Sequence, residues 1–204
     1  MACSFEQELL LHSRGIHPVA GIDEAGRGPL AGPVVAAAVI LPPDFALPGL
    51  DDSKKLTPRK RDSLYAGLTS NPAVVWASAH CDHGEIDRLN ILRATHHAMR
   101  EAFLSLSVRP VHVLIDGLPV PDFPCKQTAL VGGDALSLSI AAASVIAKVE
   151  RDRMMEDLDR QFPEYGFSKH KGYPTPDHLA RLRKHGPSSV HRRSFAPVAQ
   201  AGLR

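Results

Sequence analysis

The 204-residue sequence has only three cysteines, Cys3, Cys81 and Cys125, and no two of them are spaced as CxxC. An odd number of widely separated cysteines argues against a disulfide framework and favours a reducing cytosol. No apolar run approaches the roughly 18 residues that a membrane span needs, so we expect no membrane partner. The N-terminal residues MACSFEQELLLHSRG also lack the basic start and the cleavage site of a secretory signal. These absences predict a cytoplasmic globular protein.

Acidic side chains are nearly absent from the C-terminal segment, residues 169–204. This segment has eight lysines and arginines but one acid, Asp177, whereas the rest of the chain has 16 basic and 21 acidic residues. Such a distribution favours a polyanion partner, although a solvated basic helix face would produce the same pattern. The length fits one domain over residues 1–204. We expect a core over about 17–162 and a basic helical segment over about 163–197.

Hydrophobic patterning predicts an α/β fold with a mixed sheet flanked by helices. The expected strands are 18–26, 32–42, 73–80, 111–117 and 128–134. The expected helices open at Thr57-Pro58, run through 85–106 and 140–162, and open again at Thr175-Pro176 before ending at Gly186. The expected order is β-β-β-α-β-α-β-α with further helix at the C-terminal end. Three early strands then form a meander, and helical crossovers join the later strands in parallel.

Three of the expected strands end in acidic residues: Asp23 with Glu24, then Asp116, then Asp134. An acid at the end of one strand is usually a turn residue. If the first, fourth and fifth strands run parallel, however, all these acids meet at one edge of the sheet. Open α/β sheets bind their ligands at that edge.

Gathering these carboxylates has an energetic consequence. Two carboxylates about 5 Å apart repel by roughly 3 kcal/mol at an effective dielectric constant of about 20. Four of them therefore need a cation or bound protons. Oxygen ligands without histidine or cysteine select Mg²⁺ or Mn²⁺ over Zn²⁺. Such a cluster suits phosphodiester hydrolysis assisted by two metal ions.

The glycines after the first acids allow a different interpretation. Gly26, Gly28 and Ala31 satisfy the dinucleotide-binding pattern GxGxxA. That pattern requires a helix directly after the glycines, because the pyrophosphate rests on the helix N-terminus. Here Pro33 and the run VVAAAVIL favour a strand instead, and the adjacent acids would repel a pyrophosphate. We therefore prefer the metal site.

The chain resembles bacterial ribonuclease HII motif by motif, from about residue 18 to 197. The segments that carry the resemblance are GIDEAGRGPLAGPVVAAAVIL, DDSKKL, LNILRAT, LIDG, GD followed by AAASVIAKVERD, YGFSKHKGYPTPDH and HRRSF. Each is weak alone, but their joint order is highly specific. The related ribonuclease HIII carries an extra N-terminal domain and a different glycine loop, so the HII branch fits better. The resemblance implies a ribonuclease H-like fold with a helical C-terminal extension.

The resemblance also implies a function. Members cut RNA in RNA–DNA hybrids and at ribonucleotides embedded in duplex DNA, leaving 3′-hydroxyl and 5′-phosphate ends. Their metal-binding, catalytic acids fall on Asp23, Glu24, Asp116 and Asp134. Only the 2′-hydroxyl distinguishes RNA from DNA at a given site. The segment that reads it through its backbone falls on Gly26-Arg27-Gly28, where glycine permits close approach, and the tyrosine that packs on the junction sugar falls on Tyr173.

Further substrate contacts are expected from polar residues in the same motifs. Phosphate contacts position a nucleic acid without reading its sequence. The expected residues are Lys54, Lys55, Asn90, Ser144, Lys148, Lys169, Lys171, Arg192 and Arg193. For any one of them, a surface or capping role is an equal alternative. We expect the chain to act as a monomer.

One position departs from the family pattern. The family usually has Lys-Gly-Asp at the fourth acid, whereas this chain has Gly132-Gly133-Asp134. A lysine there would offset the repulsion between the acids or hold a phosphate. Because all four acids remain, we expect activity; the alternative is a catalytically weak nucleic-acid-binding module of the same fold.

The segment His80-Cys81-Asp82-His83 is a second candidate for metal binding. A structural zinc site normally needs four ligands at set spacing, and no second half follows. We therefore interpret the segment as a loop that starts the next helix. His96 and His97 lie on neighbouring faces of a helix and cannot chelate one ion together.

Overall fold

A five-stranded mixed sheet forms the centre of the computed structural model, which describes residues 3–202. The strands are β1 (Val19–Ala25), β2 (Val34–Ile40), β3 (Val75–Cys81), β4 (His112–Asp116) and β5 (Lys126–Leu130), arranged in the order β3-β2-β1-β4-β5. β1, β2 and β3 form the expected antiparallel meander. β4 runs parallel to β1, and β5 runs parallel to β4. The predicted α/β fold class is confirmed.

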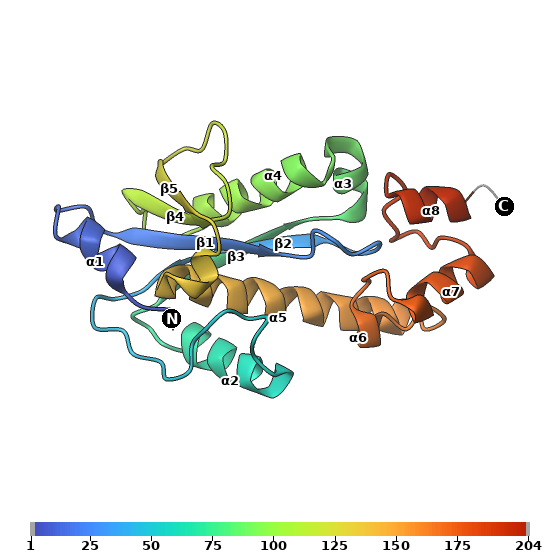
Figure 1. The fold of residues 1–204 in the computed structure, drawn as a ribbon, viewed down its shortest axis with the longest axis horizontal. Helices are drawn as coiled ribbons and strands as arrows, with labels where there is room; N and C mark the ends of the chain where they lie inside the picture. The colour runs from blue at the N-terminus through green and yellow to red at the C-terminus, as the bar shows by residue number, and fades with distance from the viewer. Residues whose placement is uncertain (1–2, 203–204) are drawn as a thin grey trace.

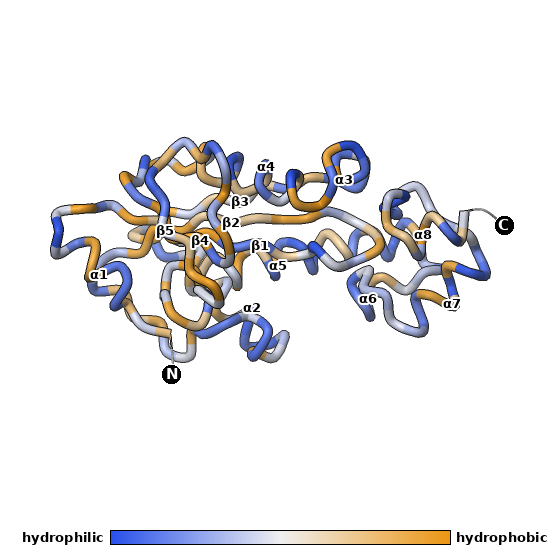
Figure 2. Tube along the Cα trace, turned by 45° about the horizontal axis from the view of Figure 1, so that its top comes forward, coloured by the Kyte–Doolittle hydropathy of each residue, from blue (hydrophilic) through white to orange (hydrophobic). Residues whose placement is uncertain are grey.

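Helices cover both faces of this sheet (Figure 1). On one face, α4 (Ile91–Leu104) packs with Ala20, Ile22 and neighbouring strand residues into one buried cluster. On the other face, α5 (Leu138–Gln161) and α2 (Pro58–Thr69) bury a second cluster around Ala37 and Val39. Hydrophobic residues follow the strands, whereas α2 is mostly hydrophilic (Figure 2). Nowhere in residues 3–202 does a helix combine the length and apolar character needed to cross a membrane.

The order of elements differs from the prediction in two places. α2 lies between β2 and β3, so the expected order of three uninterrupted strands is wrong, although the helix opens at Thr57-Pro58 as predicted. No helix joins β4 to β5 within the described chain, because the connecting residues 117–125 contain Pro119, Pro121 and Pro124. Proline lacks the backbone N–H that a helix interior requires. The parallel β4–β5 pair is therefore connected by an irregular segment.

Helix boundaries also differ. The single helix expected over 85–106 is two helices, α3 (His83–Leu89) and α4, separated at Asn90, whose φ is 67°. A non-glycine residue with positive φ cannot continue an α-helix, and asparagine is among the residues that tolerate it best. Three helices were not placed from the sequence: α1 (Glu6–His12), α6 (Phe167–His170) and α8 (Ala196–Ala201).

The C-terminal segment, here residues 163–202, packs beyond the end of α5, at the right of Figure 1. It contains α6 (Phe167–His170) and α7 (Pro176–His185), the latter capped by Thr175 and ended at Gly186 as predicted. α8 follows it, so α7 is not the last helix. Arg204, counted in the basic segment, lies outside the described residues.

The C-terminal segment is joined to the glycine loop, residues 26–33, by backbone hydrogen bonds. Leu30 donates to the Gly172 carbonyl at 2.8 Å and accepts from the Arg192 N–H at 2.8 Å. Gly32 donates to the Val190 carbonyl at 3.0 Å. The segment therefore determines where the loop lies relative to the strand end that precedes it.

Buried histidines hold the C-terminal segment together. His178 and His191 are fully buried, and their Nε2 atoms lie 3.1 Å apart. The Nδ1 of His191 lies 2.7 Å from the Ser188 hydroxyl. Burial, followed by the charge of His178, lowers the pKa of His191 to about 3. The folded protein thus keeps this ring neutral in mild acid.

This arrangement predicts that acid destabilises the protein through His191. The unfolded chain protonates this ring below its ordinary pKa of 6.5, whereas the folded protein does so only near pH 3. Stability is therefore full above about pH 6.5 and is lost as the pH falls toward 3, by up to about 1.4 kcal/mol per pH unit for one proton. Urea unfolding of His191→Gln between pH 7 and 4 should show a shallower dependence than wild type. The exposed His80→Gln is the control, and an unchanged slope in His191→Gln would refute the assignment.

Candidate active site

The parallel pairing of β1 with β4 brings two of the predicted acids together. Ile22 lies opposite Ile115 in the register, so the next residues along the two strands are Asp23 and Asp116. The third acid, Asp134, lies in the short 3₁₀ helix η1 (Gly133–Ala135), which follows β5. One carboxylate oxygen from each of these three residues lies within 4.8 Å of the other two. Three acids that are far apart in sequence thus share one place at the sheet edge.

Backbone N–H groups orient two of these carboxylates. Asp23 Oδ1 accepts a hydrogen bond from the Glu24 N–H at 2.7 Å. Asp116 Oδ1 accepts one from the Gly133 N–H at 2.7 Å, which connects β4 to η1. These bonds leave other oxygens of both carboxylates for a ligand.

A lysine from another segment supplies positive charge to the cluster. Lys54 Nζ donates to Asp134 Oδ2 at 3.2 Å. Burial lowers the pKa of Lys54, but the hydrogen bond and the charge of Asp134 outweigh it and raise the pKa overall. Gly132, where the family usually has lysine, adopts a left-handed conformation with φ of 68°, and no atom lies within 4 Å of a Cβ placed there. Lys54 therefore provides charge compensation beside the fourth acid in this chain.

The electrostatics of the cluster favour a bound cation. Burial, followed by the charges of Glu24 and Asp116, raises the pKa of Asp23 well above its ordinary value. Burial and then the charge of Asp134 raise the pKa of Asp116. A divalent cation would relieve both desolvation and repulsion, and carboxylate oxygens are the ligands that Mg²⁺ and Mn²⁺ prefer. The residues present therefore fit a hard divalent metal ion.

Glu24 is placed differently from the other acids. Successive side chains of a strand point to opposite faces of the sheet, so the Glu24 side chain lies on the face opposite that of Asp23. It is outside the set of oxygens within 4.8 Å and accepts from Arg27 Nη1 at 3.4 Å. Burial raises its pKa, Arg27 opposes this rise, and Asp116 adds to it. Glu24 is thus electrostatically coupled to the cluster while its side chain contacts the glycine loop.

The glycine loop approaches other residues so closely that it excludes side chains. Gly26 has φ of 98°, and a Cβ there would lie 2.0 Å from the Arg151 Nε. Gly28 faces Tyr173, whose ring would lie 3.6 Å from a Cβ on that glycine. Tyr173 is 42% exposed, so its ring and the exposed Gly28 backbone form one accessible surface. A strand, β2, follows this loop, which confirms the expectation that argued against dinucleotide binding.

Arg192 holds the loop and is not a surface contact. The side chain is fully buried. Its guanidinium donates to the carbonyls of Gly26 at 2.6 Å, Arg27 at 2.9 Å, Gly32 at 3.0 Å and Pro33 at 3.0 Å. Burial lowers its pKa to about 9. The expectation that Arg192 contacts a phosphate is therefore corrected, because its donors are already used by the loop and solvent does not reach it.

Arg151 of α5 has the same role and was missed in the sequence. It is 1% exposed and donates to the carbonyls of Pro33 at 2.9 Å, Ala31 at 3.3 Å and Lys171 at 3.0 Å. It thus connects the loop to the C-terminal segment. One feature of the sequence could have indicated this role. In the segment AAASVIAKVERD, Arg151 lies at helical spacing from small residues that are buried on one face of α5.

The other predicted contact residues are dispersed around the cluster. Asn90 caps α4 by accepting from the Arg93 N–H at 3.1 Å, as in the capping role that was the alternative to a substrate contact. Ser144 is buried with its Oγ 2.7 Å from the Ser53 Oγ, and its hydroxyl is close enough to Asp23 to oppose slightly the rise in the pKa of that carboxyl. The remaining cations pair with acids or are exposed: Lys55 with Asp51 at 3.1 Å, Lys148 with Asp152 at 2.6 Å, Lys171 with Glu156 at 2.8 Å, and exposed Lys169 and Arg193.

A carboxylate cluster at the carboxyl ends of parallel strands, beside an accessible glycine backbone in a mixed sheet, defines a metal-dependent nuclease of the ribonuclease H class. The chain belongs to the ribonuclease HII family, since that family's model, described as Ribonuclease HII, matches residues 20–198.

Similar proteins agree with this assignment. The chain is 56% identical over 197 residues to a ribonuclease HII of Geobacillus thermodenitrificans, and the aligned region covers 97% of this chain and 74% of that protein. It is 57% identical over 190 residues to a ribonuclease HII of Burkholderia ambifaria, and the aligned region covers 93% of this chain and 87% of that protein. The fold matches the crystal structure of ribonuclease H2 from Pyrococcus horikoshii with a TM-score of 0.75 and 28% identity, over 91% of this chain and 97% of that one. The chain is accordingly a metal-dependent ribonuclease that acts on RNA–DNA hybrids.

The role of Arg192 predicts that its removal loosens the loop. Arg192→Met leaves four carbonyls without their shared donor, so we expect a loss of about 3 kcal/mol in the free energy of unfolding. Hybrid cleavage should fall as well. Chemical unfolding measures the first effect and a cleavage assay the second. Arg193→Met, at the exposed neighbouring position, should change stability by no more than about 0.5 kcal/mol. An equal loss of unfolding free energy in the two variants would contradict the anchoring role.

Proposed function

We propose that Asp23, Glu24, Asp116 and Asp134 hold Mg²⁺ or Mn²⁺ and that the chain cuts RNA in hybrids and at ribonucleotides embedded in duplex DNA. The observation that carries this proposal is the convergence of three carboxylates within 4.8 Å of one another at the end of β1, the strand that leads into the glycine loop. The products would be a 3′-hydroxyl and a 5′-phosphate. We also propose that the chain acts as a monomer.

The metal, when bound, would activate the attacking water and stabilise the departing oxygen. The protein's own residues determine where these events take place. Asp23 and Asp116 are held by backbone N–H groups, so they need little reorganisation to receive an ion. Lys54 neutralises part of the acidic charge from the Asp134 side and lies where a substrate phosphate would approach the acids.

Recognition of RNA is proposed for the glycine loop. Among residues 3–202, the backbone N–H groups of Arg27 and Gly28 find no hydrogen-bond acceptor. Both residues are exposed, so a ligand can reach these groups. Free N–H groups next to an acid cluster suit a ribose 2′-hydroxyl, which DNA lacks. Arg192 and Arg151 keep these groups in place by binding the carbonyls of the same loop.

Tyr173 is proposed to test the neighbouring sugar. Its exposed ring faces Gly28, so a ribose held by the loop would bring the next sugar against the ring. A deoxyribose can pack more closely on an aromatic face than a ribose, because it has no 2′-hydroxyl. This contact would favour cutting at a junction between RNA and DNA.

Phosphate contacts are proposed for the cations on the accessible surface. These are Lys54, Lys55, Lys148, Lys169, Lys171 and Arg193, whereas Arg192 acts through the loop. Several of them pair with acids in the free protein, and phosphates would compete with those acids. Binding of the hybrid should therefore weaken as the salt concentration rises.

The first prediction for this site concerns the metal ligands. Asp116→Asn removes one charge from the cluster, so cleavage of a hybrid with Mg²⁺ should fall at least about 100-fold. The far-ultraviolet circular dichroism and the binding of the hybrid should remain near those of wild type. A chelator should abolish wild-type cleavage. Asp44→Asn, at an exposed position away from the cluster, is the matched control.

Two outcomes would overturn this proposal. Full cleavage by Asp116→Asn would exclude Asp116 as a ligand. Wild-type protein that binds the hybrid but never cuts it, with or without metal, would favour the alternative of a nucleic-acid-binding module.

The second prediction concerns the junction sugar. Tyr173→Ala should reduce cutting at a single embedded ribonucleotide more than cutting of an all-RNA strand, because only the junction offers the deoxyribose. Tyr173→Phe keeps the ring and should retain most of the preference. The measurement is the ratio of initial rates on the two substrates, and an unchanged ratio in Tyr173→Ala would refute the packing role.

A further inference from the structure

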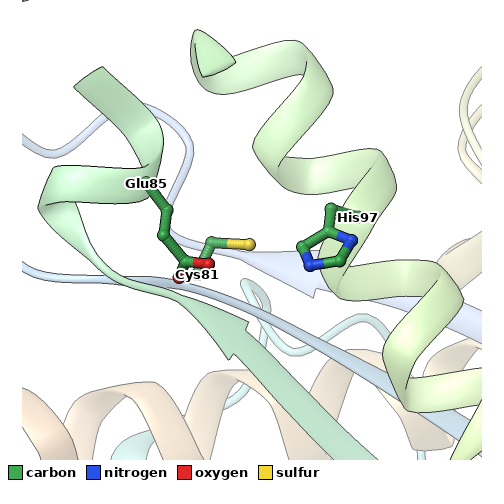
Figure 3. Close-up of side chains that lie close together, drawn as sticks. All are labelled: Cys81, Glu85 and His97. Atoms are coloured by element: carbon green, nitrogen blue, oxygen red, sulfur yellow. The ribbon is translucent and has the colours of Figure 1, made fainter. Parts of the chain in front are cut away.

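Cys81, Glu85 and His97 come together on the α4 side of the sheet (Figure 3). Cys81 is the last residue of β3, Glu85 lies in the first turn of α3, and His97 lies in α4. The Cys81 sulfur, a Glu85 carboxylate oxygen and a His97 ring nitrogen all lie within 4.8 Å of one another. In Figure 3 the sulfur of Cys81 points toward the ring of His97.

These ligands differ from the set that the sequence suggested. In His80-Cys81-Asp82-His83, the first two residues end β3, and Asp82 is the N-cap of α3 and accepts from the Glu85 N–H at 2.8 Å. The segment therefore starts the next helix as expected, but it continues a strand and is not a loop. His80 is exposed, whereas Cys81 is fully buried, as alternation along a strand requires. Cys81 therefore meets residues from two helices rather than its sequence neighbours.

We propose that Cys81, Glu85 and His97 form a second metal site for Zn²⁺ or a chemically similar ion such as Co²⁺. A thiolate, an imidazole and a carboxylate are the three ligand types that zinc takes in proteins, whereas Mg²⁺ avoids sulfur. Three protein ligands leave a fourth tetrahedral position for water. His97 and Glu85 are half-buried, and His97 also lines a surface depression of about 570 Å³.

The site offers ligand atoms that a metal could bind, and its two negative ligands match the charge of a divalent ion. Glu85 Oε2 accepts from the Asp82 N–H at 3.0 Å, which orients the carboxylate and leaves Oε1 for a metal. The thiol of Cys81 now donates to the Ala94 carbonyl at 3.3 Å. Metal binding would break the S–H bond, form a metal–sulfur bond and release one proton to solvent. The two negative ligands would then neutralise the ion.

The free thiol is poorly suited to ionise without a metal. Burial, followed by the charge of Glu85, raises the pKa of the Cys81 thiol to about 11. A divalent ion reverses both effects, because it stabilises the thiolate and pairs with the carboxylate. Burial and the raised pKa therefore disfavour the thiolate of Cys81 unless an ion binds it.

This site is separate from the candidate active site. Cys81 belongs to the buried cluster on the α4 face, whereas Asp23 lies beside Ser144 of α5 on the opposite face. A metal here would connect β3 to α3 and α4, two helices that are otherwise joined through Asn90. Since the unfolded chain does not hold the three ligands together, binding stabilises the fold.

The experiment adds Co²⁺ alone to metal-free protein kept reduced with a phosphine. We expect a near-ultraviolet band from charge transfer between thiolate and cobalt, together with the strong visible bands of tetrahedral Co²⁺. Equilibrium dialysis with Zn²⁺ should give one thiolate-dependent site per chain, and Zn²⁺ should raise the Tm. Cys81→Ser should lose the near-ultraviolet band and the rise in Tm.

Control variants separate this site from the others. Cys125→Ser and Cys3→Ser should keep the band, which excludes the other two cysteines. Asp116→Asn should also keep it, because the active-site acids are not involved. His97→Gln, at a half-buried position that tolerates the change, should weaken Co²⁺ binding even if Cys81→Ser proves unstable. Absence of the band in wild type, its persistence in Cys81→Ser, or unchanged binding in His97→Gln would each overturn the proposal.

Discussion

Electrostatic repulsion between buried carboxylates is the constraint on which the rest of this structure depends. The parallel pairing of β1 and β4 puts Asp23 beside Asp116, and η1 adds Asp134. Burial makes each negative charge more costly and each neighbour raises the cost further, as the raised pKa values of Asp23 and Asp116 reflect. A divalent cation bound by these carboxylates would remove much of this cost. The grouping of acids that would bind a metal is thus also the source of the electrostatic cost.

Two buried arginines perform the complementary task of holding the glycine loop. Arg151 and Arg192 bind the carbonyls of residues in the loop, which leaves N–H groups on its accessible side. A guanidinium is suited to this task because its five donors diverge in one plane and can bind several carbonyls at once. Arg192 belongs to the C-terminal segment, so that segment shapes the loop as well as adding positive charge. The basic residues near the C-terminus therefore serve two purposes that composition alone does not separate.

The sequence predicted the parts of the site that depend on local patterns. Strand patterns and the acids at their ends indicated where Asp23, Asp116 and Asp134 would meet, because parallel strands align their carboxyl ends. Caps such as Thr175 and Gly186 marked α7 correctly. The break at Asn90 was missed, because its two flanking helices share one apolar periodicity. α8 was missed because its six residues are too few to show a period.

From the sequence alone, hydrophobic period gave the fold class, and the order of motifs gave the family. The acids at the strand ends could also be named, and three of them do meet at one edge of the sheet. Only the tertiary structure decided how adjacent residues divide their roles. Arg192 is buried and Arg193 exposed, and Asp23 joins the cluster while Glu24 contacts Arg27. Likewise, Cys81 meets Glu85 and His97 instead of its sequence neighbours. The physical reason is that neighbours in a chain point in different directions, and what each side chain meets depends on segments that are distant in sequence.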